Sequence, residues 1–167
     1  SDPTLRIADV GTGSGAIAVT LAARLPAARV LATDISAAAL QVAQRNGQNL
    51  PNLRYMQCDL LSGIGGQFDV ICANLPYIAT AELQELEVAK FEPLLALDGG
   101  ADGLALIRAL LQQAPSHMTT PGLLLLEIGA EQGEAVCAAA QEAFGERAQI
   151  SLHKDRAGLD RVLQVAL

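Results

Sequence analysis

The chain has 167 residues and a net charge of −7 at pH 7; 51% of its residues are hydrophobic and 17% are charged. This length and composition can build one sizeable core, so we expect a single domain. The longest apolar runs are far shorter than the roughly 20 residues that a membrane helix needs, and no secretory signal pattern opens the chain. The acidic balance argues against direct nucleic-acid binding, because that relies on clustered Lys and Arg.

Short apolar runs alternate with segments of helical periodicity along the chain. Several of the expected strands are apolar throughout, which is typical of a mostly parallel sheet covered by helices on both faces. Ser36 is placed to cap the second helix, and residues 60–67 are turn-rich and too short for a full helix. The expected strands are 5–10, 29–33, 53–58, 68–73, 123–128, 149–153 and 161–167, and the expected helices are 16–25, 37–49, 82–90, 104–114 and 131–144.

A glycine-rich loop follows the first expected strand, with the sequence Asp9-Val10-Gly11-Thr12-Gly13-Ser14-Gly15. Glycines at this point let the backbone turn tightly and approach a ligand closely, and the helix that follows offers free amides. Asp34 ends the second strand, 19 residues after Gly15, close to the offset of about 20 residues at which an acidic side chain holds ribose hydroxyls. The loop and the acid together predict a nucleoside site.

The glycine loop alone does not say which nucleoside is bound. Gly11, Gly13 and Ala16 also satisfy the G-x-G-x-x-G/A pattern of dinucleotide-binding proteins, so a nicotinamide-dependent oxidoreductase stays open. Asp9 is placed to meet the amino group of S-adenosylmethionine, which favours that cofactor. A structural interpretation, in which the glycines only make a turn and Asp34 only caps a helix, is the remaining alternative.

The tetrapeptide Asn74-Leu75-Pro76-Tyr77 follows the strand expected at 68–73. Ligands of open α/β sheets bind at the carboxyl ends of strands, where this tetrapeptide lies. The Asn74 carbonyl and nearby backbone acceptors suit the N–H groups of an amide or amino nitrogen, and Tyr77 could pack against the flat group that carries it. A strand-ending Asn-x-Pro turn with a buried tyrosine is an equally good interpretation of these four residues by themselves.

With these two motifs, nearly the whole chain resembles the glutamine methyltransferases of the HemK/PrmC family, which modify peptide chain release factors. The most specific part of the resemblance is the segment 87–104. The shared residues beyond the two motifs are Glu87, Val88, Phe91, Glu92, Pro93, Ala96, Leu97, Gly99, Gly100, Asp102, Gly103, Leu104, Leu126, Glu127, Ile128, Gly129, Gln132, Asp155, Ala157, Gly158, Asp160, Arg161 and Val162.

The resemblance implies a Rossmann-like class I methyltransferase fold with a seven-stranded, mostly parallel sheet whose last strand is inserted antiparallel. It implies methylation of the glutamine side-chain amide in the Gly-Gly-Gln loop of a release factor, with S-adenosylhomocysteine as product. Cofactor contacts are expected from Asp9, Gly11, Thr12, Gly13, Ser14, Gly15, Asp34, Asp59, Leu60 and Asn74. Substrate contacts are expected from Asn74, Leu75, Pro76 and Tyr77, with Asn74, Pro76 and Tyr77 as the catalytic set.

Two departures from the family pattern accompany these expectations. Leu75 stands where the family usually has the first of two prolines, which predicts a less rigid loop. The chain also reaches its first strand within a few residues, so we expect residues 1–167 to be the methyltransferase domain without the family's amino-terminal helical domain.

Two other function classes stay open at this point. The same tetrapeptide could serve an exocyclic amino group of a flipped nucleic-acid base, although the acidic charge and the segment 87–104 disfavour it. A non-catalytic module that binds a nucleoside is the second alternative.

The remaining reactive side chains predict no further chemistry. Three cysteines, Cys58, Cys72 and Cys137, are an odd number without metal-ligand spacing, which favours a reducing, cytoplasmic setting. Cys58 and Cys72 fall in apolar segments, where cysteine usually acts as a small buried hydrophobe. His117 and His153 have no partners at metal spacing, so we assign no metal.

Overall fold

The structure is a computed structural model that describes residues 4–84 and 96–167. One seven-stranded sheet runs through these residues in the order β3-β2-β1-β4-β5-β7-β6. The first five strands are parallel, and β7 is inserted antiparallel between β5 and β6. The strands are β1 (Arg6–Val10), β2 (Arg29–Asp34), β3 (Leu53–Gln57), β4 (Phe68–Ala73), β5 (Met118–Glu127), β6 (Gln149–Lys154) and β7 (Asp160–Ala166).

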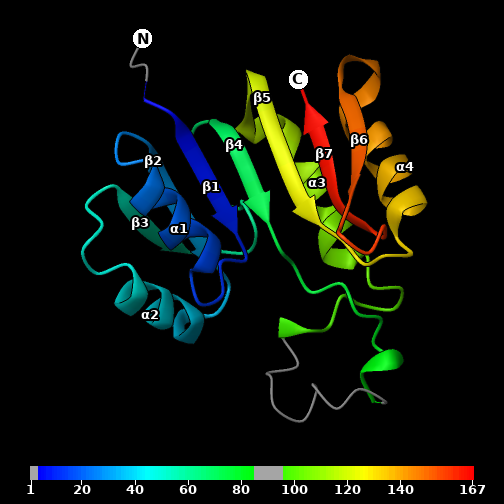
Figure 1. The fold of residues 1–167 in the computed structure, drawn as a ribbon, viewed down its shortest axis with the longest axis horizontal. Coiled ribbons are helices and arrows are strands. Elements are labelled where there is room, and N and C mark those ends of the chain that lie inside the picture. Colours follow the sequence, from blue (N-terminus) through cyan, green and yellow to red (C-terminus); the bar gives the residue numbers. More distant parts are fainter. Residues whose placement is uncertain (1–3, 85–95) are drawn as a thin grey trace.

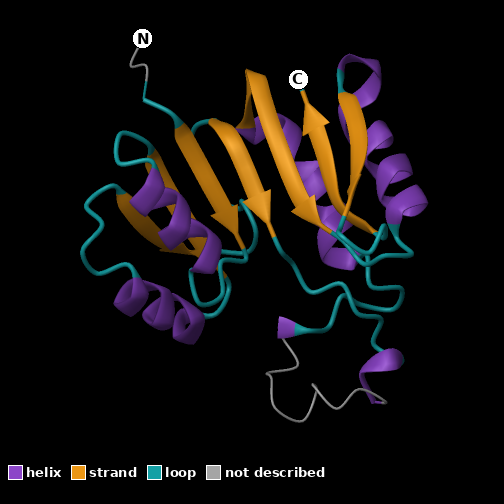
Figure 2. Ribbon diagram, in the orientation of Figure 1, coloured by secondary structure: helices purple, strands orange, loops and turns teal. Residues whose placement is uncertain are grey.

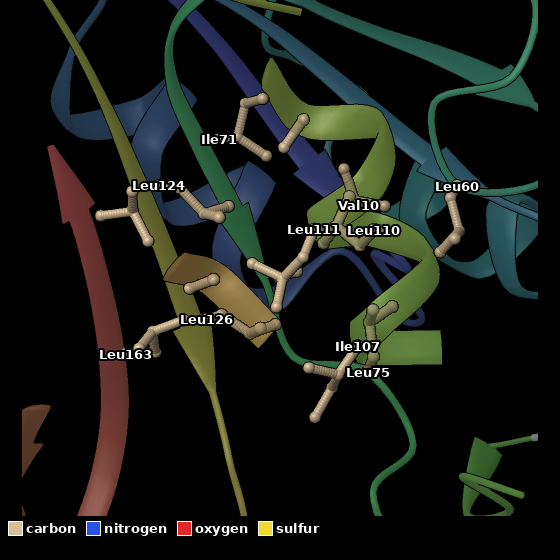
Figure 3. Close-up of a cluster of buried hydrophobic side chains, with 14 of the residues drawn as sticks. Val10, Leu60, Ile71, Leu75, Ile107, Leu110, Leu111, Leu124, Leu126 and Leu163 are labelled. Carbon is tan, nitrogen blue, oxygen red and sulfur yellow. The ribbon is translucent and has the colours of Figure 1, made fainter. Parts of the chain in front are cut away.

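Helices cover both faces of the sheet, as Figures 1 and 2 show. On one face the buried alanines of α1 pack with side chains of β1, β2 and β3. On the other face α3 and α4 pack on the central strands in a larger cluster, part of which is drawn in Figure 3. The α-helices are α1 (Ala16–Arg24), α2 (Ala37–Asn46), α3 (Ala105–His117) and α4 (Gly133–Phe144).

This architecture confirms the expected fold, including the antiparallel last strand: most of the parallel strands alternate with helices that cover the sheet. Ser36 caps α2 as expected: its Oγ accepts a hydrogen bond from the backbone N–H of Ala39 at 3.2 Å. The segment between β3 and β4 forms turns and no helix, which confirms that reading as well.

Several boundaries differ from the sequence-based expectation, most of them by one or two residues. Helix α2 ends three residues early, at Asn46, with Gly47 as its C-cap. Helix α3 continues through Pro115 to His117, where the hydroxyl of Ser116 and the ring of His117 both bind the carbonyl of Gln113. Pro115 cannot donate the ladder hydrogen bond of its position, and the two side-chain contacts to the Gln113 carbonyl stabilise the last turn beyond it. Strand β5 consequently begins at Met118 rather than at residue 123. Within the helix expected at 82–90, only a short 3₁₀ turn, Glu82–Gln84, lies in the described residues; the rest lies outside them.

Candidate functional site at the carboxyl edge of the sheet

The pairing of the strands brings the two sequence motifs to one edge of the sheet. Val10, the last residue of β1, is the register partner of Thr33 in β2 and of Ala73 in β4. The residues that follow these three are Gly11, Asp34 and Asn74. The start of the glycine loop therefore lies between the acidic residue and the tetrapeptide, at the edge where open α/β sheets bind ligands.

The three glycines of the loop all have positive φ, +69° at Gly11, +55° at Gly13 and +85° at Gly15. Other residues rarely adopt this conformation. Two of them also lack room for a side chain: a methyl group on Gly11 would lie 2.6 Å from Cδ2 of Leu75, and one on Gly15 would lie 2.9 Å from Cβ of Ala43. A methyl group on Gly13 would meet no atom within 4 Å, so this glycine marks the open side of the loop.

Asp9 is buried beneath the loop, with 1% of its surface exposed. Its Oδ2 accepts hydrogen bonds from the Thr12 hydroxyl at 2.6 Å and from the backbone N–H of Ala18 at 3.0 Å. Helix α1 has Gly15 as its N-cap, which offers no side chain, so Asp9 satisfies one of the free amides at the start of α1. Through these two bonds Asp9 holds the loop in place, and a contact of its carboxylate with the ligand's amino group stays a prediction.

The environment of Asp9 also changes its acidity. Burial raises the pKa of this carboxyl above its usual value, and the nearby negative charge of Asp34 adds to the increase. The two hydrogen bonds from Thr12 and Ala18 act in the opposite direction because they favour the ionised form. Thr12 is itself buried by this arrangement, so its side chain supports the loop from below, whereas the side chain of Ser14 is exposed.

Asp34 is half-buried and touches the glycine loop. Its Oδ2 accepts a hydrogen bond from the backbone N–H of Gly13 at 2.9 Å, and its Oδ1 accepts one from Ser36 at 2.8 Å. A carboxylate oxygen can accept more than one hydrogen bond, so Asp34 can hold the loop and still accept from a hydroxyl group. The structure thus joins the two parts of the predicted nucleoside site.

Asp59 and Leu60, the residues expected on the adenine side of the cofactor, differ in exposure. Asp59 follows β3 and is exposed, whereas the side chain of Leu60 is 8% exposed and belongs to the core. Leu60 has a φ of +53°, and its carbonyl accepts hydrogen bonds from the Thr33 hydroxyl and the Cys58 thiol. Any ligand contact at Leu60 must therefore come from its backbone.

Cys58, for which the sequence predicts only a packing role, lies close to Asp34 and Asp59. Its backbone N–H donates to the Asp34 carbonyl at 3.1 Å. Desolvation raises the pKa of the Cys58 thiol, and the charges of Asp59 and Asp34 raise it further. Cys58 lies beside Asp34 because β2 pairs with β3, and no sequence pattern around either residue indicates this pairing.

The first two residues of the tetrapeptide, Asn74 and Leu75, differ in exposure. The side chain of Asn74 is exposed. Leu75 is 3% exposed and belongs to the same core cluster as Ile107 and Leu110 of α3 (Figure 3). The loop that was expected to be less rigid without a proline is therefore anchored by burial of Leu75, which also packs against Gly11.

Pro76 and Tyr77 complete the tetrapeptide and are half-buried. The Tyr77 hydroxyl lies 3.4 Å from Oε1 of Glu127, the last residue of β5. Since Ala73 is the register partner of Leu126, Glu127 takes the next place after Asn74 along the same edge. Glu127 was noted only as a shared residue of the family, and the tertiary pairing gives it this position.

Other candidate groups lie away from this edge or form no cluster. In the described part of the chain, no three His, Cys, Asp or Glu side chains gather as metal ligands, and no helix is long and apolar enough to span a bilayer. His117 is placed 3.2 Å from the Ile64 carbonyl, and His153 lies beside Gln164. A cavity of about 910 Å³, which Arg6, Arg29 and Arg54 help to line, lies at the opposite edge, where β1 and β2 begin. It does not overlap the predicted site.

The strand order, the inserted antiparallel β7 and the glycine loop with its acidic partner define a Rossmann-like class I methyltransferase fold. The chain belongs to the methyltransferase small domain family, whose family model matches residues 1–91.

Two relatives of similar sequence are both described as release factor glutamine methyltransferases. The chain is 44% identical over 165 residues to the release factor glutamine methyltransferase of Lactococcus lactis, covering 97% of this chain and 61% of that protein. It is 49% identical over 160 residues to that of Moorella thermoacetica, covering 93% of this chain and 56% of that protein. The chain therefore spans about three fifths of the length of these relatives.

Solved structures agree on the fold. The ribosomal protein L11 methylase of Lactobacillus delbrueckii subsp. bulgaricus superposes with a TM-score of 0.70 at 30% identity, covering 98% of this chain and 70% of that one. A methyltransferase from Pyrococcus furiosus superposes with a TM-score of 0.69 at 20% identity, covering 98% and 74%. The second similarity concerns the fold alone.

Proposed function

We propose that this chain transfers a methyl group from S-adenosylmethionine to the side-chain amide nitrogen of the glutamine in the Gly-Gly-Gln loop of a peptide chain release factor. The observation that carries the proposal is the position of Asn74: it is exposed and lies next to Gly11 along the carboxyl edge of the sheet. An exposed amide at this edge is accessible to a ligand that binds beside the glycine loop.

The loop after β1 fits the proposed cofactor. Gly13 faces open space, the α1 amides lie behind it, and Asp34 stands beside it with acceptor capacity for ribose hydroxyls. Gly11, Gly13, Ser14 and Gly15 would contact the cofactor, Thr12 and Asp9 would support the loop, and Asp59 with the backbone of Leu60 would border the adenine. When bound there, S-adenosylmethionine supplies a methyl group on a sulfonium, which is reactive towards weak nucleophiles.

Asn74 would orient the glutamine amide. Its side-chain carbonyl and a backbone carbonyl of the tetrapeptide would accept the two amide hydrogens, so the nitrogen faces the methyl group at close range. The bond from sulfur to the methyl carbon would break as the nitrogen–carbon bond forms, the nitrogen would release one proton to solvent water, and S-adenosylhomocysteine would be the second product. Tyr77, held by Glu127, would lie against the flat amide, and Leu75 and Pro76 would shape the loop.

Three observations support this substrate over others. The relatives named above are described as release factor glutamine methyltransferases, and the edge carries Asn74 and Tyr77 as that family does. The charge of −7 disfavours a nucleic-acid substrate. Because all three cysteines are free, we also propose a reducing, cytoplasmic setting, where release factors act.

The direct test is methylation of a purified release factor with isotopically labelled S-adenosylmethionine, followed by mass spectrometry of the peptide that contains Gly-Gly-Gln. We expect one added methyl group on the glutamine and none when that glutamine is replaced by Ala. Parallel reactions with DNA and RNA test the alternative of a base amino group, and label transferred only to nucleic acid would overturn the proposal. Tight cofactor binding with no transfer to any of these substrates would instead indicate a non-catalytic module.

A further inference from the structure

We infer that Gln132 is a positioning residue of this site: its side-chain amide fixes the backbone of the tetrapeptide through the Tyr77 carbonyl. The inference rests on the proposed function, because it concerns the loop that would hold the substrate amide. Gln132 precedes α4 and lies far from Tyr77 in sequence.

The Gln132 side chain joins three loops by hydrogen bonds. Its Nε2 donates to the Tyr77 carbonyl at 2.9 Å and to the Gly103 carbonyl at 3.4 Å. Its Oε1 accepts from the backbone N–H of Gly129 at 2.9 Å. Both ends of the amide are thereby used, which fixes its orientation and ties the tetrapeptide to the loops before α3 and after β5.

Two glycines let the loop before α3 lie directly against the tetrapeptide. Gly103 has a φ of +74°, and a methyl group on it would overlap the Tyr77 carbonyl and lie 2.8 Å from Nε2 of Gln132. A methyl group on Gly99 would lie 2.8 Å from the carbonyl oxygen of Pro76. The carbonyls of Pro76 and Tyr77 are thus closely approached by the loop before α3, and Gln132 supplies a polar contact there.

The contact fixes the direction of the Tyr77 carbonyl and, with it, the backbone of the tetrapeptide that follows Asn74. If the amide of Gln132 is lost, the Tyr77 carbonyl is left without this donor and the loop can shift. A misplacement of about 1 Å in a reacting group can cost on the order of 100-fold in rate.

The test compares Gln132→Glu and Gln132→Met with the unaltered chain in methyl transfer to a release factor. Glu keeps the shape but, when ionised, has no N–H to donate, and Met keeps the length without either hydrogen bond. We expect kcat to fall roughly 100-fold in both, with the Kd for S-adenosylmethionine changed by less than about twofold. Protonation of the new Glu restores one donor, so the activity of Gln132→Glu relative to the unaltered chain should rise as the pH falls.

Gln141→Glu is the matched control, since it makes the same chemical change at an exposed position of α4, the helix that follows Gln132, and it should keep full activity. If the unaltered chain methylates glutamine and both Gln132 variants match it, the inference is wrong and the proposed function stands. Equal losses of kcat and cofactor affinity would also overturn it, because they would indicate a general structural role. Failure of the unaltered chain to methylate any glutamine would refute the proposed function and this inference together.

Discussion

Asn74 shows how a single side chain acquires a functional position. It is polar and exposed, and it directly follows β4. The neighbouring strand β1 ends at the same edge and leads into the glycine loop. A side chain in this position contributes little to the folded core, so replacing it should affect chemistry without affecting stability.

Asn74→Ala should therefore lower the turnover of the proposed methyl transfer by roughly 100- to 1,000-fold, the range found when one preorganised orienting group is removed. The cofactor Kd, measured by isothermal titration calorimetry, should stay within about twofold. Asn49→Ala, at an exposed position outside the proposed site, is the control. Parallel losses of turnover and cofactor affinity would contradict this division of labour.

At the same scale, the buried carboxyl of Asp9 predicts how the free energy of unfolding depends on pH. Burial raises its folded-state pKa above the unfolded value, so its contribution to stability is full at low pH and is lost as the pH rises through the folded pKa. Asp9→Asn keeps an oxygen acceptor for Thr12 and Ala18 and removes the charge. The free energy of unfolding, measured in urea from pH 4 upward, should fall less with rising pH in the variant than in the unaltered chain. Identical pH dependence in the two proteins would show that Asp9 does not contribute in this way.

At the scale of elements, the contact between the β1–α1 loop and the loop after β4 joins the two halves of the site. Gly11 belongs to the first loop and Leu75 to the second, and the close approach of the two depends on the missing side chain of Gly11. Leu75, which replaces the proline expected from the family resemblance, places its side chain in the core.

Gly11→Ala should weaken cofactor binding and lower turnover together, at least tenfold each, because a methyl group at φ +69° would lie 2.6 Å from Leu75. Gly63→Ala is the matched control: Gly63 has a φ of +75° but no atom within 4 Å of an added methyl group. The control experiences only the conformational cost of positive φ, of roughly 1–2 kcal/mol. Equal effects of both substitutions on cofactor affinity would show that the contact with Leu75 has no importance.

At the scale of the whole molecule, the reactivity of the Cys72 thiol in the central strand β4 can report global unfolding. Cys72 lies in β4 with 9% of its surface exposed, and burial raises the pKa of its thiol to about 11. A thiol in this state reacts only when the sheet opens, because the thiolate is the reactive form. Cys58 and Cys137 are half-buried and serve as internal comparisons.

Alkylation of Cys72 by iodoacetamide, followed by mass spectrometry of its peptide, should be the slowest of the three cysteines. S-adenosylmethionine at 100 times its Kd should slow it about 100-fold further, because a ligand of the folded state stabilises it by mass action. Labelling of Cys72 as fast as that of Cys137 would mean that the centre of the sheet opens without global unfolding.

The local sequence was sufficient for the elements because hydrophobic periodicity and chain punctuation act over a few residues. It identified the strands, the helix cap at Ser36, the glycine loop, Asp34 and the tetrapeptide, and it showed the absence of a helix between β3 and β4. It failed at Pro115, where side chains of the helix end allow α3 to continue.

The tertiary structure alone decided how these parts meet. The enclosed position of Asp9, the burial of Leu75 against Gly11, and the places of Glu127 and Gln132 all depend on which strands are neighbours and in which register. Those pairings join residues far apart in the chain, and their energies come from packing and hydrogen bonds that exist only once the sheet has formed.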